Sequence, residues 1–443
     1  MFVGAAHFAR SVVKAPKNLA VAETAIRSLS TTRPHTQKKG ADRTQSTAFT
    51  KKEGGSSGSG KKLRSGTATS VNLLNANPTY YIEPARIQLA TLNANTANDS
   101  HVNKFVQIDD ALLQSIGKGH FPGTLGRDFK LFGRPALLYR RITQQLVDRL
   151  TGAPEQRATV IDGKNGSGKS AELMKLAAVA AAKGHIVVYA HSTLPWVNSS
   201  RPYAPANEGS LFVQHELTLE LLKSVLMLSK EALARVALGR EVVLGKKTLT
   251  AEQTLADLVS FGIYTPSLAH DALDQLLTVA SAQTQVPLLV ALDNVNTLWC
   301  NTAYRDQQDA VLPAERLRLV RAFLPFFDGS RAISSGLAVG ATSYSEVRFM
   351  PRDLKERLNP PPMVPLANPD VASDPKVTRP LTDVPFDVVK VDRMTAQEAW
   401  ALMAFYHKTN VVSMPVTESL VAQKWVVADG NPRQIFGSVT SYF

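Results

Sequence analysis

One short segment constrains the fold more than any other part of the chain. It is Gly163-Lys164-Asn165-Gly166-Ser167-Gly168-Lys169-Ser170, followed by Ala171. The segment fits the P-loop pattern G-x-x-x-x-G-K-[ST] at every defined position. An apolar run before it, residues 158–162, predicts a strand, and the Ala- and Leu-rich run 169–183 after it predicts a helix. Because strand and helix flank the loop as a P-loop requires, we interpret it as a phosphate-binding loop rather than a chance glycine-rich turn.

The residue types in this loop match the chemistry of a nucleotide phosphate. Glycines let the backbone come close to the phosphates with its N–H groups pointing inward. The following helix adds its positive N-terminal end. Lys169 can reach the β and γ phosphates, and the Ser170 hydroxyl is a ligand for Mg²⁺. We therefore expect residues 163–171 to bind a nucleoside diphosphate or triphosphate together with Mg²⁺.

The surrounding pattern predicts an α/β fold with a parallel sheet flanked by helices. Gly184 is placed to end the first helix, and a second apolar strand follows over 185–190, which completes a βαβ unit. Further apolar runs predict strands over 286–292 and 336–341, with a helix over about 312–327 between them. Residues 209–283 have a mostly helical pattern, and the spacing of leucines predicts a helix over 131–150.

A second candidate for magnesium binding is Asp293, which directly follows an apolar strand. A carboxylate at the carboxyl end of such a strand holds Mg²⁺ in P-loop ATPases. Many of these enzymes place a glutamate next, to polarise the attacking water, but this chain has Asn294 there. An amide can orient water but cannot accept its proton at neutral pH, so fast hydrolysis is not expected by this route. Glu216 or Glu346 could substitute, although no spacing supports either.

Three further positions are weaker candidates for contacts with the nucleotide. Ser343 follows the strand over 336–341, where a polar residue can contact the γ phosphate or the water, and Asn294 could do the same. Arg433 could reach the nucleotide from a C-terminal lid, or it could be a surface arginine. Trp196 and Trp299 could stack on a base, but core packing is the default. No guanine-reading N/T-K-x-D element is present, so the residues leave the base open.

The charge of the chain is concentrated in its N-terminal part. Residues 1–70 hold 13 Lys/Arg against 3 Asp/Glu, so they carry +10 of the formal net charge of +13. Residues 1–33 combine basic, hydroxyl and apolar residues with a single acid, which is typical of a mitochondrial presequence. Residues 34–75 form a basic Gly/Ser-rich tail that we expect to be disordered. It could order on RNA phosphates or serve only as a linker.

The remaining boundaries follow from composition. Residues 76–156 form an extension leading into the core, and 157–358 form the nucleotide-binding core. Residues 359–387 contain 8 of the 25 prolines, so 359–385 are expected to be a linker. Residues 386–443 hold a last core strand and a small helical domain, with Asn431 capping a helix that starts at Pro432. No run of 18 apolar residues occurs, so no membrane span is expected, and Cys300, the single cysteine, excludes a disulfide framework.

These motifs together resemble the death-associated protein family of the mitochondrial small ribosomal subunit. The more specific mark is the pattern D-x-x-N-x-L-W, met by Asp293, Asn296, Leu298 and Trp299, and the segment 428–433 is also similar. The resemblance runs from about residue 80 to the C-terminus. It implies an AAA+-like P-loop core with a small C-terminal helical lid, and a bound guanine nucleotide, GTP or GDP, although the residues themselves leave ATP possible.

The resemblance also implies partners and a compartment. The implied partners are the rRNA and proteins of the mitochondrial small subunit in its head region, and the large subunit across the interface. The implied compartment is the mitochondrial matrix. Asn294 agrees with a stably bound nucleotide that is hydrolysed slowly or not at all. The alternative is a free NTPase switch in the matrix, of the AAA+ or signal-transduction type, for which the intact P-loop is the motivation.

Overall fold

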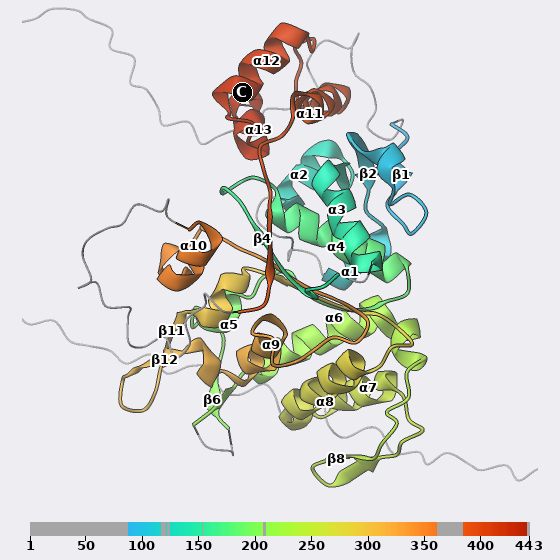
Figure 1. Cartoon of the computed structure of the whole chain (residues 1–443), viewed down its shortest axis with the longest axis vertical. Coiled ribbons are helices and arrows are strands. Elements are labelled where there is room, and N and C mark those ends of the chain that lie inside the picture. Colours follow the sequence, from blue (N-terminus) through green and yellow to red (C-terminus); the bar gives the residue numbers. More distant parts are fainter. Residues whose placement is uncertain are drawn as a thin grey trace, which may run out of the picture. The chain divides into compact units, whose positions relative to one another are not determined.

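A computed structural model describes residues 87–116, 121, 125–152, 154–206, 210–360 and 384–440 (Figure 1). All of these residues belong to one compact unit, Ser70–Phe443. The expected presequence 1–33, the basic tail 34–75 and most of the Pro-rich linker 359–385 lie outside the described residues. The account below therefore concerns the expected core, its extension and the C-terminal helices.

The centre of the fold is a five-stranded sheet in which every pairing is parallel. Its strands follow the order β14-β4-β13-β10-β5, where β4 is Ala158–Asp162, β5 is Ile186–Ala190, β10 is Leu288–Asp293, β13 is Gly336–Ala341 and β14 is Asp387–Lys390. The predicted parallel α/β sheet is confirmed. Because β13 lies between β4 and β10, the P-loop strand and the strand that ends in Asp293 are separated by one intervening strand.

Helices cover both faces of this sheet, which explains why β4, β5, β10 and β13 are buried at every position instead of at alternate ones. Helices α3 (Arg141–Thr151) and α4 (Lys169–Ala182) pack on one face with Val187 and Leu289. Helices α6 (His215–Ala234), α7 (Leu255–Tyr264), α8 (Ala269–Ala282) and α9 (Arg318–Phe327) pack on the other with Val188 and Val290. Neighbouring residues of one strand thus belong to two different cores, and both sets are buried.

The predicted helix over 131–150 is only partly right. Helix α2 (Leu125–Phe132) ends early, strand β3 (Ala136–Tyr139) follows, and α3 begins at Arg141. Pro135 disfavours helix at the residue before it, which breaks the leucine spacing. Strand β3 pairs with β2 (Lys104–Gln107), which pairs with β1 (Ala90–Thr91), so a three-stranded sheet precedes the P-loop core.

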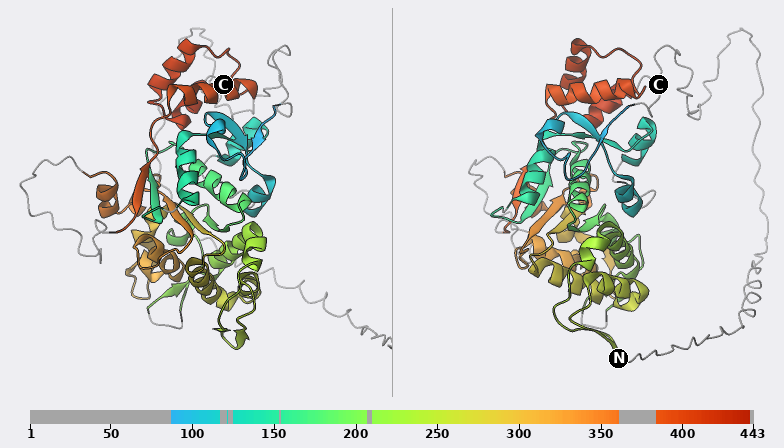
Figure 2. Two further views of the ribbon diagram at one scale, coloured as in Figure 1. Left: turned by 45° about the vertical axis from the view of Figure 1, so that its right-hand side comes forward. Right: turned by 90° about the vertical axis from the view of Figure 1, so that its right-hand side faces the viewer.

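Strand β3 also joins two hydrophobic cores. Leu137 and Tyr139 face the core beneath α3 and α4, whereas Ala136 and Leu138 face a third core with Phe132. This third core is shared with the C-terminal helices α11 (Ala396–Lys408), α12 (Glu418–Val427) and α13 (Pro432–Thr440). Figures 1 and 2 show these helices next to β2 and α2, and α11 contacts both β2 and β3.

Each of the three C-terminal helices begins at a capping residue, and Asn431 caps α13 as the sequence predicts. Thr395 and Thr417 cap α11 and α12, and the Asn431 side chain accepts hydrogen bonds from the N–H groups of Arg433 and Gln434 in α13. Pro432 occupies the first helical position, where the missing N–H costs nothing. The predicted helical C-terminal segment is therefore confirmed as a set of three helices.

The remaining elements are short and lie mostly around α6–α9. Helices α6, α7 and α8 confirm the helical prediction for 209–283, which missed the hairpin of β8 (Val242–Leu244) and β9 (Lys247–Leu249). The others are α1 (Asp110–Ile116), α5 (Leu194–Val197), β6 (Ala204–Pro205), β7 (Phe212–Val213), β11 (Asn301–Arg305), β12 (Val311–Pro313) and α10 (Arg352–Leu358). None of the helices described here is long and apolar enough to cross a membrane.

Candidate nucleotide site

The P-loop connects β4 to α4 at the carboxyl edge of the parallel sheet, where ligands of such sheets bind. Gly166 and Gly168 have φ of +82° and +103°, a region that side chains with a Cβ rarely adopt. Gly163 lies so close to the chain that an added Cβ would be 2.8 Å from the Val391 carbonyl oxygen. The glycines are therefore required by the backbone path itself.

Lys169 stands at the first position of α4 with its side chain folded back over the loop. Its Nζ donates to the carbonyl oxygens of Gly163 and Lys164, at 2.6 and 3.1 Å, and lies 5.6 Å from the centre of the Tyr344 ring. Burial lowers the pKa of Lys169, and the carboxylates of Asp162 and Asp293 oppose that shift. The ammonium group is thus partly desolvated, which strengthens its attraction for an anion.

Ser170 and Asp293 meet, as a magnesium site requires. The side chain of Ser170 lies beside the Asp293 carboxylate, which is buried at the end of β10. Burial raises the pKa of Asp293 to about 6, while Ser170, the Asn294 N–H and Lys169 act to lower it. One hydroxyl and one carboxylate oxygen, completed by phosphate and water oxygens, are a ligand set that suits Mg²⁺.

Asn294, which follows this carboxylate, has a left-handed backbone with φ of +64°. Its side-chain oxygen accepts a hydrogen bond from the Ser192 hydroxyl at 3.2 Å. The alternative glutamates lie in other contacts, because Glu216 pairs with Arg201 and Glu346 pairs with Arg348. Both of these glutamates thus have an arginine partner, and Asn294 holds the position that follows Asp293.

A second buried carboxylate, Asp162, ends the P-loop strand and was missed by sequence reasoning. Thr342 Oγ1 and Tyr344 OH donate to its Oδ1 at 2.7 and 2.9 Å, and Lys390 Nζ donates to its Oδ2 at 2.6 Å. Burial acts to raise the pKa of Asp162, but the hydrogen bonds from Lys390, Thr342 and Tyr344 outweigh it and hold that pKa below its ordinary value. Asp162 therefore joins the carboxyl ends of β4, β13 and β14.

Ser343 lies at the end of β13 and lines the same cavity as the P-loop. Its N–H donates to the Asn296 side chain at 2.9 Å, and Asn296 donates in turn to the Phe349 carbonyl oxygen at 2.9 Å. Ser343 Oγ lies 2.8 Å from Ser345 Oγ. Asn296, which carried part of the D-x-x-N-x-L-W pattern, thus orients the loop that presents Ser343.

The C-terminal helices touch the P-loop directly. Asn431 Nδ2 donates to the Asn165 carbonyl oxygen at 2.9 Å, and Lys164 Nζ is 2.6 Å from the Asp429 carboxylate. An added Cβ on Gly166 would lie 2.8 Å from Arg433 Cβ. Arg433 therefore lies against the loop from α13, as its candidate role requires.

A cavity of about 250 Å³ extends from the P-loop to the C-terminal helices. Its polar wall is formed by Asn165–Ala171 together with Ser343, Arg433 and Arg140. An apolar and aromatic group also lines the cavity and comprises Phe105, Leu125, Phe132, Leu402, Tyr406 and Phe436. A nucleotide has charged phosphates and a flat, largely apolar base. A cavity lined by P-loop residues and by aromatic side chains can accommodate both parts.

The residues present also fit a phosphate group in detail. Among the side chains that the structure describes, Ser167 Oγ and Arg140 Nε are buried without a hydrogen-bond partner, and both residues line this cavity. A buried hydroxyl or guanidinium N–H with no partner is uncommon, and a phosphate oxygen would accept from either. No group of three or more His, Cys, Asp or Glu suited to a metal occurs among the described residues, so a metal here relies on Ser170, Asp293 and the nucleotide.

Of the two tryptophans considered for base stacking, Trp196 lies in the core and Trp299 is partly buried against it. Trp196 is buried, with its ring 5.4 Å from that of Phe323. Trp299 packs edge-on to Phe327 and beside Phe386. Neither lines the cavity, whose aromatic residues come from β2, α2, α11 and α13. Sequence reasoning missed these because they are far apart in the chain.

Comparisons with known proteins agree with the motifs. The profile of the family described as mitochondrial ribosomal death-associated protein 3 matches residues 137–438, about two thirds of the chain. The small ribosomal subunit protein mS29 of Schizosaccharomyces pombe is 26% identical over 348 residues, which cover 76% of this chain and 71% of that protein. The protein of the same name from Neurospora crassa is 22% identical, over 67% of this chain and 66% of that protein. The one from Bos taurus is 23% identical, over 50% of this chain and 58% of that protein.

Proposed function

The chain belongs to the family of mitochondrial ribosomal death-associated protein 3, and on this premise we propose that it is a structural component of the mitochondrial small ribosomal subunit that holds a nucleotide at its P-loop. The relatives are named as small-subunit proteins, and their likeness extends over 76% of this chain in the Schizosaccharomyces pombe protein. The rRNA and the neighbouring ribosomal proteins, with the large subunit across the interface, are the partners that follow from this role in mitochondrial translation.

The nucleotide is a purine diphosphate or triphosphate with Mg²⁺. The observation that carries this proposal is the meeting of the P-loop, Lys169, Ser170 and Asp293 at one edge of the sheet, beside a cavity with an aromatic end. Ser170 and Asp293 would hold the Mg²⁺, Lys169 would hold the phosphates, and Arg433 would contact them from the C-terminal helices, which then act as a lid. Guanine is the base that the family resemblance favours.

Hydrolysis is slow or absent in this proposal, because Asn294 takes the position after Asp293 and the two candidate glutamates, Glu216 and Glu346, pair with arginines. A side-chain amide can hold a water by hydrogen bonds but cannot remove its proton. The nucleotide then stabilises the fold by binding only the folded state, an effect that grows with the logarithm of its concentration over its dissociation constant.

Two measurements test this proposal. Mitochondrial lysate is sedimented, and the chain is expected in the small-subunit fractions; a chain that stays at the top of the gradient would contradict the ribosomal role. The subunit fractions are then denatured, and the released nucleotide is identified by chromatography. We expect close to one purine nucleotide per chain, and its absence would contradict the nucleotide role alone.

A matched pair of lysine variants locates the nucleotide. Lys169→Met removes the ammonium group at the P-loop, whereas Lys183→Met removes an exposed one at the other end of the same helix. We expect Lys169→Met to weaken binding roughly 10- to 100-fold, the value of one or two charge-assisted hydrogen bonds. Lys183→Met should bind as the unmodified chain does. Steady turnover of GTP or ATP that Lys169→Met abolishes would favour the alternative, a free NTPase switch.

A further inference from the structure

We propose that Arg140 is a positioning residue that couples nucleotide binding at the P-loop to the docking of the C-terminal helices α11–α13. The coupling rests on the proposed nucleotide binding and adds a consequence to it. Arg140 lies between β3 and α3, outside every motif of the sequence, and it precedes the P-loop by more than twenty residues. Its role follows from what its guanidinium contacts.

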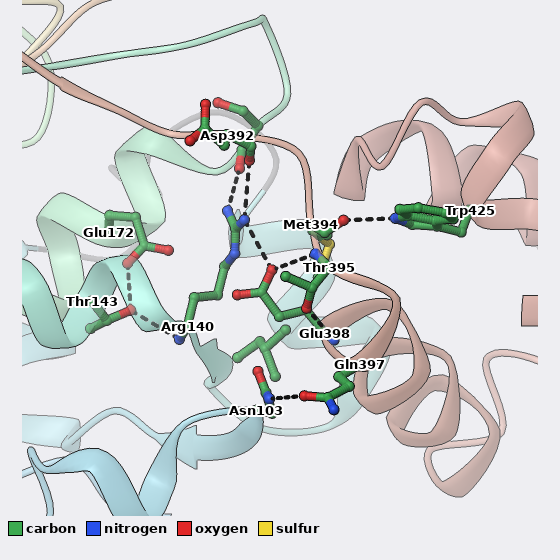
Figure 3. A network of polar contacts seen from close by, with 12 residues as sticks. Asn103, Arg140, Thr143, Glu172, Asp392, Met394, Thr395, Gln397, Glu398 and Trp425 are labelled. Atoms are coloured by element: carbon green, nitrogen blue, oxygen red, sulfur yellow. Dashed lines mark hydrogen bonds and ion pairs between the residues drawn. The ribbon is translucent and has the colours of Figure 1, made fainter. Parts of the chain in front are cut away.

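The guanidinium of Arg140 joins the P-loop to the stretch that leads from β14 into α11 (Figure 3). Nη1 of Arg140 donates to the Ser167 carbonyl oxygen of the P-loop at 3.2 Å. Nη2 donates to the Asp392 carbonyl oxygen, in the connection between β14 and α11, at 3.1 Å, and to Glu398 Oε2 in α11 at 3.1 Å. Arg140 is 7% exposed and Glu398 is 3% exposed, so this ion pair is shielded from water and salt.

Glu398 also takes part in the capping box of α11, which fixes the position of its carboxylate. It is the third residue of α11, and its Oε2 accepts a hydrogen bond from the Thr395 N–H at 3.0 Å, while Thr395 Oγ1 accepts from the Glu398 N–H at 3.1 Å. This capping box determines where α11 begins. The carboxylate that starts the C-terminal helices is therefore the same one that binds Arg140.

The backbone of Arg140 is tied to the P-loop helix as well. Its N–H donates to Thr143 Oγ1 at 3.1 Å, and Thr143 Oγ1 donates to Glu172 Oε2, in the first turn of α4, at 2.5 Å. Lys175 Nζ, which is fully buried, bonds both Thr143 and Glu172. Arg140 is thus held against the helix that follows the P-loop, and its side chain reaches the loop itself.

The nucleotide cavity touches this arrangement directly. Arg140 lines the cavity together with Ser167, and its Nε is buried without a hydrogen-bond partner among the described residues. The guanidinium places a positive charge beside the phosphate-binding loop. A phosphate bound by the P-loop would be attracted by this charge. It would also order the Ser167 peptide, whose carbonyl oxygen accepts a hydrogen bond from Arg140.

The two events are coupled because the Arg140 side chain contacts both the P-loop and the start of the C-terminal helices. When the loop is ordered by phosphate, Arg140 is held in the geometry that Glu398 and Asp392 require, so α11–α13 dock more tightly. The reverse also holds, since coupling between two sites is reciprocal: docked helices raise the affinity for nucleotide. Couplings of this kind change an affinity typically about 5- to 150-fold. A structural protein would thus hold its C-terminal helices more tightly while the nucleotide is bound.

The test is hydrogen exchange of the full chain with and without Mg²⁺ and GDP. In the unmodified chain we expect GDP to slow exchange both in the P-loop and in α11–α13. In Arg140→Lys, which keeps the charge but loses the forked contacts, saturating GDP should still protect the P-loop. The added protection of α11–α13 should be lost, and GDP should bind about 5- to 150-fold more weakly.

Two further variants keep the test decisive. Arg141→Lys is the matched control, because Arg141 is the next residue and pairs with Asp99 on the surface, and it should behave as the unmodified chain. Glu398→Gln keeps an oxygen for the capping box but removes the negative charge, so it should reduce the transmitted protection even if Arg140→Lys does not fold.

The outcomes separate this inference from the proposed function. If GDP binds and protects the P-loop but leaves α11–α13 unchanged, or protects them equally in Arg140→Lys and Glu398→Gln, the coupling is wrong and nucleotide binding stands. If the unmodified chain binds no GDP, GTP or ATP, the nucleotide role is wrong, and the coupling is wrong with it.

Discussion

Replacing Gly166 by alanine tests how closely the P-loop fits against α13. Gly166 has φ of +82°, and an added Cβ would lie 2.8 Å from Arg433 Cβ and 3.0 Å from Asn431 Oδ1. Gly168 has φ of +103°, yet an added Cβ there meets no atom within 4 Å. Both alanine variants strain the backbone, but only Gly166→Ala also collides with the C-terminal segment.

The magnitudes follow from these two differences. A left-handed backbone costs an ordinary residue about 1–2 kcal/mol relative to glycine, and this applies to both positions. Forcing an extra carbon into a filled contact costs a further 1–3 kcal/mol, roughly, and this applies only to Gly166. We therefore expect Gly168→Ala to lower the free energy of unfolding by about 1–2 kcal/mol and Gly166→Ala to lower it by about 2–5 kcal/mol.

The assay is urea unfolding of the full chain, monitored by circular dichroism, after bound nucleotide has been removed. Gly437→Ala in α13 is the control, because an added Cβ there also meets no atom within 4 Å and alanine favours a helix by about 1 kcal/mol. Equal losses for Gly166→Ala and Gly168→Ala would refute the reasoning, since backbone strain alone would then account for both and the contact with Arg433 would have no energetic weight.

Three other changes have defined outcomes. Burial lowers the pKa of His270 from 6.5 to about 3, so the folded state holds a neutral imidazole that the unfolded state protonates below pH 6.5. The free energy of unfolding is therefore unaffected by this group above pH 6.5 and falls by about 2 kcal/mol at pH 5. Urea midpoints of His270→Gln should lack this part of the pH dependence. Lys175→Met leaves Glu172 buried without its cation and should cost about 3–5 kcal/mol in urea unfolding, most of which the added change Glu172→Gln restores. Gly340→Ala places a Cβ 2.5 Å from Val295 Cγ2 and should cost about 1–3 kcal/mol or more, whereas adding Val295→Ala should relieve the loss; a pair that unfolds as Gly340→Ala alone does would contradict the assigned contact.

Local signals in the sequence were enough for the core elements of the fold. The apolar runs, the glycines and the capping residues act within a few residues of themselves, so β4, α4, β5, β10, β13 and the three C-terminal helices could be placed from sequence. The helix expected over 131–150 was wrong over 133–140, because leucine spacing does not distinguish a helix face from a strand whose two faces are both buried. Leu137 and Leu138 enter different cores, and this is known only when both cores exist.

The candidate site divides in the same way. The sequence by itself determined the P-loop, Lys169, Ser170 and Asp293, because phosphate and magnesium chemistry requires these residue types at fixed spacing. Only the tertiary structure decided that Asp162 joins three strands, that Arg433 lies against Gly166, and that Arg140 links the loop to Glu398, 258 residues further along the chain. Such contacts depend on which elements pack together, and a buried ion pair between distant residues leaves no periodic trace in the sequence.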